Sequence, residues 1–219
     1  MTSTAIAVFV KTPGLSAVKT RLAADLGTAA AEQFYRLSLK AVERILEQAE
    51  QSLPVTAYWA VAEAEALCHP LWQQFKTLYT GPGDLGDRQH HIYQTLLGNY
   101  DQVILMGADS PQLGTVQLQQ TLTALESHNY VMGPAEDGGY YLFAGREPVD
   151  LEIWRAVTYS QADTAQQLLS KLSLQAAIID SLWDMDRVAD LAGLKQQLIA
   201  LPQLSDEQEL ILQWIEKTI

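Results

Sequence analysis

The segment VKTPGLSAVKTR, close to the start of the chain, places Lys11, Lys19 and Arg21 ahead of the first acidic residue. Lysine and arginine suit phosphate groups, because one is a compact charge and the other a bidentate fork. The segment is not a P-loop, since Val18 and Pro13 stand where that motif needs glycines. We therefore predict a phosphate-binding loop of another kind, with a solvated basic turn as the alternative.

An aspartate follows an apolar run in VILMGADSPQL (103–113), where Asp109 stands two residues after Gly107. A carboxylate at the carboxyl edge of a parallel sheet is well placed to bind Mg²⁺ or Mn²⁺ against a diphosphate, because these ions take hard oxygen ligands. We predict Asp109 as a metal ligand. The alternative is an aspartate that only hydrogen-bonds the turn at Ser110 and Pro111.

A second acidic motif, GPAEDGGYYLFAG, sets Asp137 directly before Gly138 and Gly139. Two glycines permit positive φ angles and let a ligand approach the backbone closely. Because Asp-Gly is also a strong hairpin signal, the motif is equally typical of a plain turn between two strands. A ligand-binding turn and a structural turn both remain open here.

A third acidic motif, DMDRVADL, contains the pair Asp184 and Asp186. Many sugar transferases hold a metal with such a D-x-D pair. We favour a structural interpretation, in which Asp186 is a helix N-cap and Asp190 lies in the first turn, where the helix dipole favours acids.

A glycine-rich motif, GPGDLGDR, matches the dinucleotide fingerprint G-x-G-x-x-G at Gly81, Gly83 and Gly86. A short polar strand precedes it, which weakens the match. In the structural alternative, Asp87 caps the following helix. Arg88 is then either a surface residue or a ligand contact.

Short apolar strands and amphipathic helices alternate along the chain and surround these motifs. We expect strands at 5–10, 54–61, 102–107, 130–135, 139–145 and 176–180. We expect helices from Thr28 onward, at 63–77, 87–98, 114–127 and 162–171, and two more at the end.

This alternation predicts an α/β fold, a three-layer α/β/α sandwich with a mostly parallel sheet covered on both faces. The two consecutive strands around Asp137 break the alternation, so the sheet should be mixed. We expect one domain over residues 1–219, because no linker or repeat interrupts the pattern. Ligands of such sheets bind beyond the carboxyl ends of the strands, where the motifs lie.

Composition narrows the function further. The net charge of −12 over 219 residues disfavours nucleic acid as a partner, whereas a small phosphorylated ligand needs only a local cationic pocket. No apolar run reaches the ~18 residues of a membrane span. The start of the chain lacks the basic region of a signal peptide. We expect a cytoplasmic protein, with no obligate protein partner evident.

The order of the motifs resembles the radical-SAM/selenodomain-associated transferases, a bacterial family of GT-A-like transferases. That family is similar to nucleotide-diphospho-sugar transferases and to small nucleotidyltransferases such as the molybdenum-cofactor guanylyltransferases. The resemblance runs from about residue 6 to residue 191. It rests on K-x-P…V-K-T-R-L, L-G-x-R, G-x-D-x-P, G-P-x-x-D-G-G-Y-Y and D-x-D…D-L. These patterns fall on residues 11–22, 85–88, 107–111, 133–141 and 184–191. The chain departs from the family at Leu15, Ser16 and Ala17, where Pro-Gly-Arg is usual.

The resemblance implies a transferase that uses an activated nucleotide donor. Asp109 would bind Mg²⁺ or Mn²⁺ against the donor phosphates. Asp137 would lie near the reacting centre, as a second metal contact or as the base that activates the acceptor, which makes Asp109 and Asp137 the implied catalytic pair. The implied nucleotide-binding and phosphate-binding residues are Lys11, Pro13, Lys19, Arg21, Gly86 and Arg88. The implied acceptor-side residues are Gly138, Gly139 and Tyr140.

Several functions remain open. The first is glycosyl transfer from a nucleotide-sugar to a small-molecule acceptor. The second is nucleotidyl transfer, of the guanylyltransferase or cytidylyltransferase kind, from a nucleoside triphosphate to a phosphorylated acceptor. A dinucleotide-binding protein that uses Gly81, Gly83 and Gly86, and a non-catalytic nucleotide-binding module, are the further alternatives.

Overall fold

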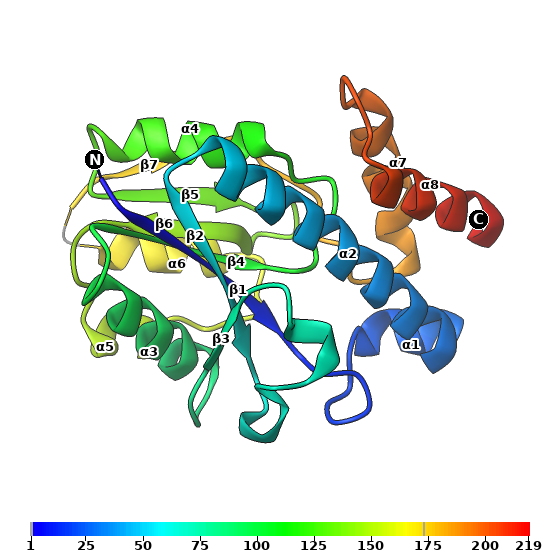
Figure 1. The fold of residues 1–219 in the computed structure, drawn as a ribbon, viewed down its shortest axis with the longest axis horizontal. Helices are drawn as coiled ribbons and strands as arrows, with labels where there is room; N and C mark the ends of the chain where they lie inside the picture. Colours follow the sequence, from blue (N-terminus) through cyan, green and yellow to red (C-terminus); the bar gives the residue numbers. More distant parts are fainter. Residues whose placement is uncertain (1, 173) are drawn as a thin grey trace.

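A seven-stranded sheet organises the structure, a computed structural model that describes residues 2–172 and 174–219 (Figure 1). In spatial order the strands are β3 (Lys76–Tyr79), β2 (Val55–Val61), β1 (Thr4–Val10), β4 (Gln102–Gly107), β6 (Tyr140–Gly145), β5 (Tyr130–Pro134) and β7 (Ala176–Ile178). The helices are α1 (Thr20–Leu26), α2 (Thr28–Ser52), α3 (Leu85–Leu97), α4 (Thr115–Leu125), α5 (Leu151–Arg155), α6 (Thr164–Lys171), α7 (Leu191–Ala200) and α8 (Asp206–Thr218).

The sheet is mixed, as the sequence predicts. Strand β6 runs antiparallel to both of its neighbours, β4 and β5. The pairings of β1 with β2 and β4, of β2 with β3, and of β5 with β7 are parallel. The hairpin between β5 and β6 turns at the Asp137-Gly138-Gly139 motif, so the Asp-Gly signal marks a real turn.

Helices cover both faces of the sheet, which gives the expected α/β/α sandwich. Side chains of β1 alternate between the two sides, because successive residues of a strand point to opposite faces. Ile6 and Val8 join the core beneath α2 and α4. Ala5 and Ala7 join the core beneath α3, α5 and α6. Figure 1 shows α4 and α2 on one side of the strands and α3 and α5 on the other.

A third apolar cluster lies beyond one end of the sheet, where α1, α7 and α8 gather around the first half of α2 (Figure 1). Phe34 of α2 packs against Trp214 of α8, with ring centroids 5.1 Å apart. Met185 is fully buried in this cluster. The cluster therefore connects the C-terminal helices to the segment that carries Asp184 and Asp186.

One expectation about the elements is wrong. The region 63–77 is not a helix, because it forms only 3₁₀ turns at Ala64–Ala66 and Pro70–Trp72 before β3 begins. Pro70 explains the break, since proline cannot donate the backbone hydrogen bond of a helix interior. The short helix α5 was not expected. Within the described part of the chain, no helix is long and apolar enough to cross a membrane.

Candidate functional site

The site lies where the strand order reverses. Strands β1 and β4 are neighbours, and the chain leads from β1 toward β2 on one side but places β4 on the other. At such a switch point the loops after the two strands diverge and leave a crevice at their carboxyl ends. The loop after β1 carries Lys11 and Lys19, and the loop after β4 carries Asp109. Topology therefore brings the predicted cations and the predicted acid to opposite walls of one crevice.

The start of the opening loop (residues 11–19) is held from several sides. The hydroxyl of Tyr35 accepts a hydrogen bond from the Lys11 N–H and donates one to the Lys11 carbonyl, both at 2.9 Å. Glu63 Oε2 accepts the Thr12 N–H at 2.9 Å, and Trp72 Nε1 donates to Thr12 Oγ1 at 3.2 Å. These contacts fix the backbone and leave the Lys11 side chain exposed.

Lys19, at the end of this loop, points into the crevice instead of toward solvent. Its side chain is only 2% exposed. Its Nζ lies 2.9 Å from Asp109 Oδ1 and 3.6 Å from Asp186 Oδ1, and it donates a hydrogen bond to the Met185 carbonyl. The backbone of Lys19 is left-handed, with φ 46° and ψ 48°, a conformation that costs a lysine free energy.

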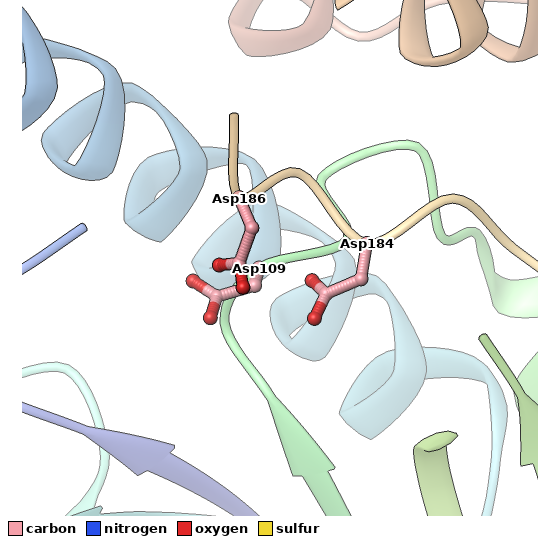
Figure 2. Close-up of side chains that lie close together, drawn as sticks. All are labelled: Asp109, Asp184 and Asp186. Atoms are coloured by element: carbon pink, nitrogen blue, oxygen red, sulfur yellow. The ribbon is translucent and has the colours of Figure 1, made fainter. Parts of the chain in front are cut away.

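Three carboxylates converge around this ammonium, and we call Asp109, Asp184 and Asp186 the acidic cluster. One oxygen of each lies within 4.8 Å of the others. Figure 2 shows Asp109 at the end of strand β4, facing Asp184 and Asp186 on the segment that follows β7. The sequence motif D-x-D pointed to the last two residues, but only the fold brings Asp109 to them.

The acidic cluster fits a divalent cation. Its ligand atoms are all carboxylate oxygens, the type that Mg²⁺ and Mn²⁺ prefer. Oδ1 of Asp184 is buried and has no hydrogen-bond partner among the described residues, which is costly unless a cation completes the site. The cluster thus contains a buried carboxylate oxygen that no described residue satisfies.

The charges of the cluster shift the proton affinities of its members. Burial, with a further contribution from the Asp109 charge, raises the pKa of Asp184 to about 7. Burial by itself lowers the pKa of Lys19, but the carboxylates of the cluster outweigh this effect and raise the pKa above its usual value. Lys19 is therefore cationic at neutral pH.

A side chain of helix α7 links the two segments that carry the acidic cluster through hydrogen bonds. Gln197 Oε1 accepts hydrogen bonds from Gln112 Nε2 at 2.9 Å and from the Trp183 N–H at 3.0 Å. Gln112 Nε2 also donates to the Trp183 carbonyl at 2.6 Å. Gln112 follows Asp109 by three residues and Trp183 directly precedes Asp184, so this triangle sets the spacing between the two loops. Its members were not singled out from the sequence.

A cavity of about 180 Å³ opens beside the acidic cluster. We call it the cationic cavity, because Lys11, Lys19 and Arg88 line it together with Asp109. Tyr35 and Thr80 add hydroxyl groups to its wall. Four of the residues implied by the resemblance therefore line this one cavity. They are Lys11, Lys19, Arg88 and Asp109.

A second hollow of about 240 Å³ adjoins the cationic cavity and shares Phe9, Leu85 and Asp109 with it. Tyr140 and Asp184 line this second hollow. The Tyr140 hydroxyl donates to Gln89 Oε1 at 2.7 Å, so α3 fixes its position. Tyr140, implied on the acceptor side, thus lines a different hollow from the cations, and Asp109 borders both hollows.

Other predicted residues lie at the margins of the site. Arg21 is exposed and binds Asp186 Oδ2 through its Nη1 at 2.7 Å. Pro13 is buried in the turn where the Leu15 and Ser16 N–H groups donate to the Thr12 carbonyl, outside the lining of the cationic cavity. Neither geometry tests a phosphate-binding role.

A hydrogen bond and a close backbone contact fix the conformation of the turn at Asp137. Asp137 is exposed, and its Oδ1 accepts the Gly139 N–H at 2.9 Å. Gly138 has a φ of 88°, and a Cβ there would lie 1.9 Å from the Ala162 carbonyl oxygen. Gly138 therefore serves the packing of the hairpin, and the predicted part of both glycines in acceptor binding stays a prediction.

The glycine-rich motif also has a packing explanation. It follows β3, which is an edge strand, and not a strand at the switch point. A Cβ at Gly86 would lie 2.7 Å from the Trp154 carbonyl oxygen, so the glycine permits α3 and α5 to pack closely. Gly86 is buried, and its predicted phosphate contact is not tested by this geometry.

Two structural interpretations of aspartates are wrong. Asp186 is not a helix N-cap, because its carboxylate binds Lys19 and Arg21, while Asp190 Oδ2 accepts the Asp186 and Arg187 N–H groups. Asp87 is not the N-cap of α3. That residue is Asp84, with Asp87 as its reciprocal partner three residues later.

The protein is an α/β protein with the nucleotide-diphospho-sugar transferase-like fold. The strand order, the helices on both faces of the sheet and the crevice at the switch point all agree with this fold. The chain belongs to the family described as an uncharacterized protein conserved in bacteria (DUF2064), whose model matches residues 39–161. No curated protein matches the sequence.

Solved structures resemble the whole chain. A "putative nucleotide-diphospho-sugar transferase" from Desulfovibrio desulfuricans G20 is 26% identical, with a TM-score of 0.85 over 99% of this chain and 98% of that one. CMP:2-keto-3-deoxy-manno-octonic acid synthetase complexed with CTP is 13% identical, with a TM-score of 0.52 over 90% and 98%. Rv0371C from Mycobacterium tuberculosis H37Rv, in complex with manganese, is 13% identical, with a TM-score of 0.51 over 88% and 97%.

Proposed function

We propose that this protein is a transferase that uses an activated nucleotide donor and a divalent cation. One observation carries the proposal: Asp109 belongs both to the acidic cluster and to the wall of the cationic cavity. A donor diphosphate bound in this cavity would lie between the cations and the cluster. The similarity to a nucleotide-diphospho-sugar transferase at 26% identity over nearly the whole chain supports the same class.

In this proposal, the cations and the carboxylates of the crevice have separate roles. Lys11 and Arg88 line the cavity and would bind the donor phosphates through charge-assisted hydrogen bonds. Asp109, Asp184 and Asp186 would hold Mg²⁺ or Mn²⁺, and the ion would offset the negative charge that develops on the leaving diphosphate.

The acceptor side of the proposal is the second hollow. Tyr140 lines it, and Asp137 lies close enough for its charge to raise the pKa of Asp184, after the larger effects of burial and Asp109. We assign Asp137 the role of base for the acceptor, with its orientation fixed by the Gly139 N–H. Removal of the acceptor proton by a positioned side chain typically contributes ~10²–10⁴-fold to such a transfer.

Among the candidate reactions we place glycosyl transfer first, in line with the motif order that resembles the radical-SAM/selenodomain-associated transferases. Calorimetric titration with a panel of nucleoside diphosphate-sugars, with and without Mn²⁺, tests the proposal. Metal-dependent binding and release of a nucleoside diphosphate are expected. Release of pyrophosphate from a nucleoside triphosphate would instead assign nucleotidyl transfer. Binding of NADH without metal, or of no nucleotide at all, would overturn the proposal.

A further inference from the structure

We propose that Lys19 is the resident counter-cation of the acidic cluster and that it leaves the cluster when the carboxylates bind a divalent ion. The starting observation is its position. A lysine whose side chain is 2% exposed places its ammonium within 3.6 Å of two of the three carboxylates and on the Met185 carbonyl. This is the place that a cation shared by Asp109 and Asp186 would take.

The charges of the cluster make the exchange favourable. When all three carboxylates are ionised they carry −3, whereas Lys19 and Arg21 together supply only +2, so full ionisation leaves one negative charge uncompensated. The uncompensated group is visible as the buried Asp184 Oδ1 without a partner among the described residues. A divalent ion in place of the ammonium neutralises the set, with Arg21 still on Asp186.

The acidic cluster cannot hold the Lys19 ammonium and a divalent ion at the same time. The ammonium already lies between Asp109 and Asp186, and its side chain is 2% exposed, so water screens little of its repulsion of a second positive charge within a few ångströms. The carboxylates therefore hold either Lys19 or the divalent ion. The metal affinity of the free protein is set by how readily Lys19 leaves.

The backbone of Lys19 is consistent with a side chain that is held in place. Lys19 and Ser160 are the non-glycine residues with positive φ in the described parts of the chain. Lysine does not favour this region by itself, so the contact of its ammonium with the acidic cluster stabilises a strained loop end. Release of the ammonium removes the reason for the strain.

The released side chain has a second binding place. Lys19 also lines the cationic cavity with Lys11 and Arg88, where an anion can bind it. This last step rests on the proposed function: exchange at the cluster would supply a third cation for donor phosphates. Binding of the divalent ion and of a phosphorylated ligand would then strengthen each other, because such coupling is reciprocal.

Lysine footprinting of the wild-type protein tests the exchange directly. Acylation of lysines is followed by mass spectrometry at rising Mn²⁺ concentration, without nucleotide. Lys19 is expected to be protected in the metal-free protein and to be labelled at least fivefold faster with saturating Mn²⁺. Exposed Lys217 of α8, outside the crevice, serves as the internal control, with unchanged labelling. Protection of Lys19 that persists at saturating Mn²⁺ would overturn the proposal.

Substitution gives an independent test with Mn²⁺ alone. Lys19→Met removes the competing cation at similar side-chain length, so calorimetry should show Mn²⁺ bound at least tenfold more tightly than by the wild type. Lys217→Met, which removes an exposed charge from α8 outside the crevice, should stay within twofold. Equal or weaker Mn²⁺ binding by Lys19→Met, or no binding by either protein, would overturn the exchange.

Thermal unfolding keeps the test decisive if Lys19→Met folds poorly without metal. The variant should then melt below the wild type in chelator and gain more than the wild type from Mn²⁺, because a ligand of the folded state raises its stability. These measurements contain no nucleotide. Failure of nucleotide binding would therefore contradict the proposed function while leaving the exchange supported.

Discussion

The Nζ atom of Lys19 lies 2.9 Å from Oδ1 of Asp109 and so joins the loop after β1 to the loop after β4. These loops flank the crevice at which the strand order reverses. The contact joins a buried lysine to an aspartate whose side chain is 40% exposed, at the edge of a cationic cavity. The predictions below ask what each part of this arrangement contributes.

Asp109→Asn should weaken Mn²⁺ binding by at least about tenfold, because even the loss of a partner outside the ligand set typically costs 10–100-fold. The amide keeps the size of the side chain but removes its charge. Isothermal titration with Mn²⁺ measures the change. Asp150→Asn is the matched control, since Asp150 is exposed and caps α5 without a side-chain hydrogen bond. Equal affinities of the two variants would remove Asp109 from the metal site.

Gln197→Ala should lower the free energy of unfolding by about 1–3 kcal/mol, because it leaves the Trp183 N–H without its acceptor and removes one of the two acceptors of the Gln112 amide. It should also weaken Mn²⁺ binding, since the two loops lose their spacing. Urea unfolding and Mn²⁺ titration measure the two effects. Gln196→Ala, on the exposed side of the same helix, should change stability by less than about 0.5 kcal/mol. A stable variant with intact Mn²⁺ binding would show that these hydrogen bonds are dispensable.

Gly138→Ala should destabilise the protein more than Gly27→Ala, although both glycines have φ near 90°. Both variants incur backbone strain of about 1–3 kcal/mol. Only at Gly138 does the added Cβ meet another atom, the Ala162 carbonyl oxygen at 1.9 Å, whereas nothing lies within 4 Å of a Cβ at Gly27. The difference between the two unfolding free energies isolates the steric contact. A difference near zero would show that the hairpin shifts without cost.

Lys11→Met should weaken binding of a nucleoside diphosphate by about tenfold, since a hydrogen bond to a charged group contributes about 1.5–3 kcal/mol. The loss should shrink as salt rises, because the Lys11 side chain is exposed and its field is screened. Thermal shift at several nucleotide concentrations measures it. Lys217→Met removes an exposed charge from α8 and should leave nucleotide binding unchanged. The same loss in both variants would assign the effect to net charge alone.

Local pattern was sufficient for most elements. The apolar run before Lys11 and the one before Gly107 predicted β1 and β4 to within a residue, and the Asp-Gly turn predicted the β5–β6 hairpin. Such elements follow from the alternation of side chains and from turn chemistry, which act over a few residues. The pattern failed at 63–77, where helical spacing was present but Pro70 prevents a continuous helix.

The sequence by itself determined the residue types of the site: cations after the first strand, an acid after the central strand and a D-x-D pair near the end. It did not determine their partners. Asp186 looked like a cap because its neighbours along the chain permit one, but β4, the C-terminal segment and the opening loop meet only in the folded protein. Lys19 appeared as a free phosphate ligand, and the tertiary structure decided that its ammonium lies among carboxylates. The physical reason is the distance along the chain over which each effect acts. Secondary-structure propensity acts between neighbours in the sequence, whereas the charges of the site act between loops that only the strand order brings together.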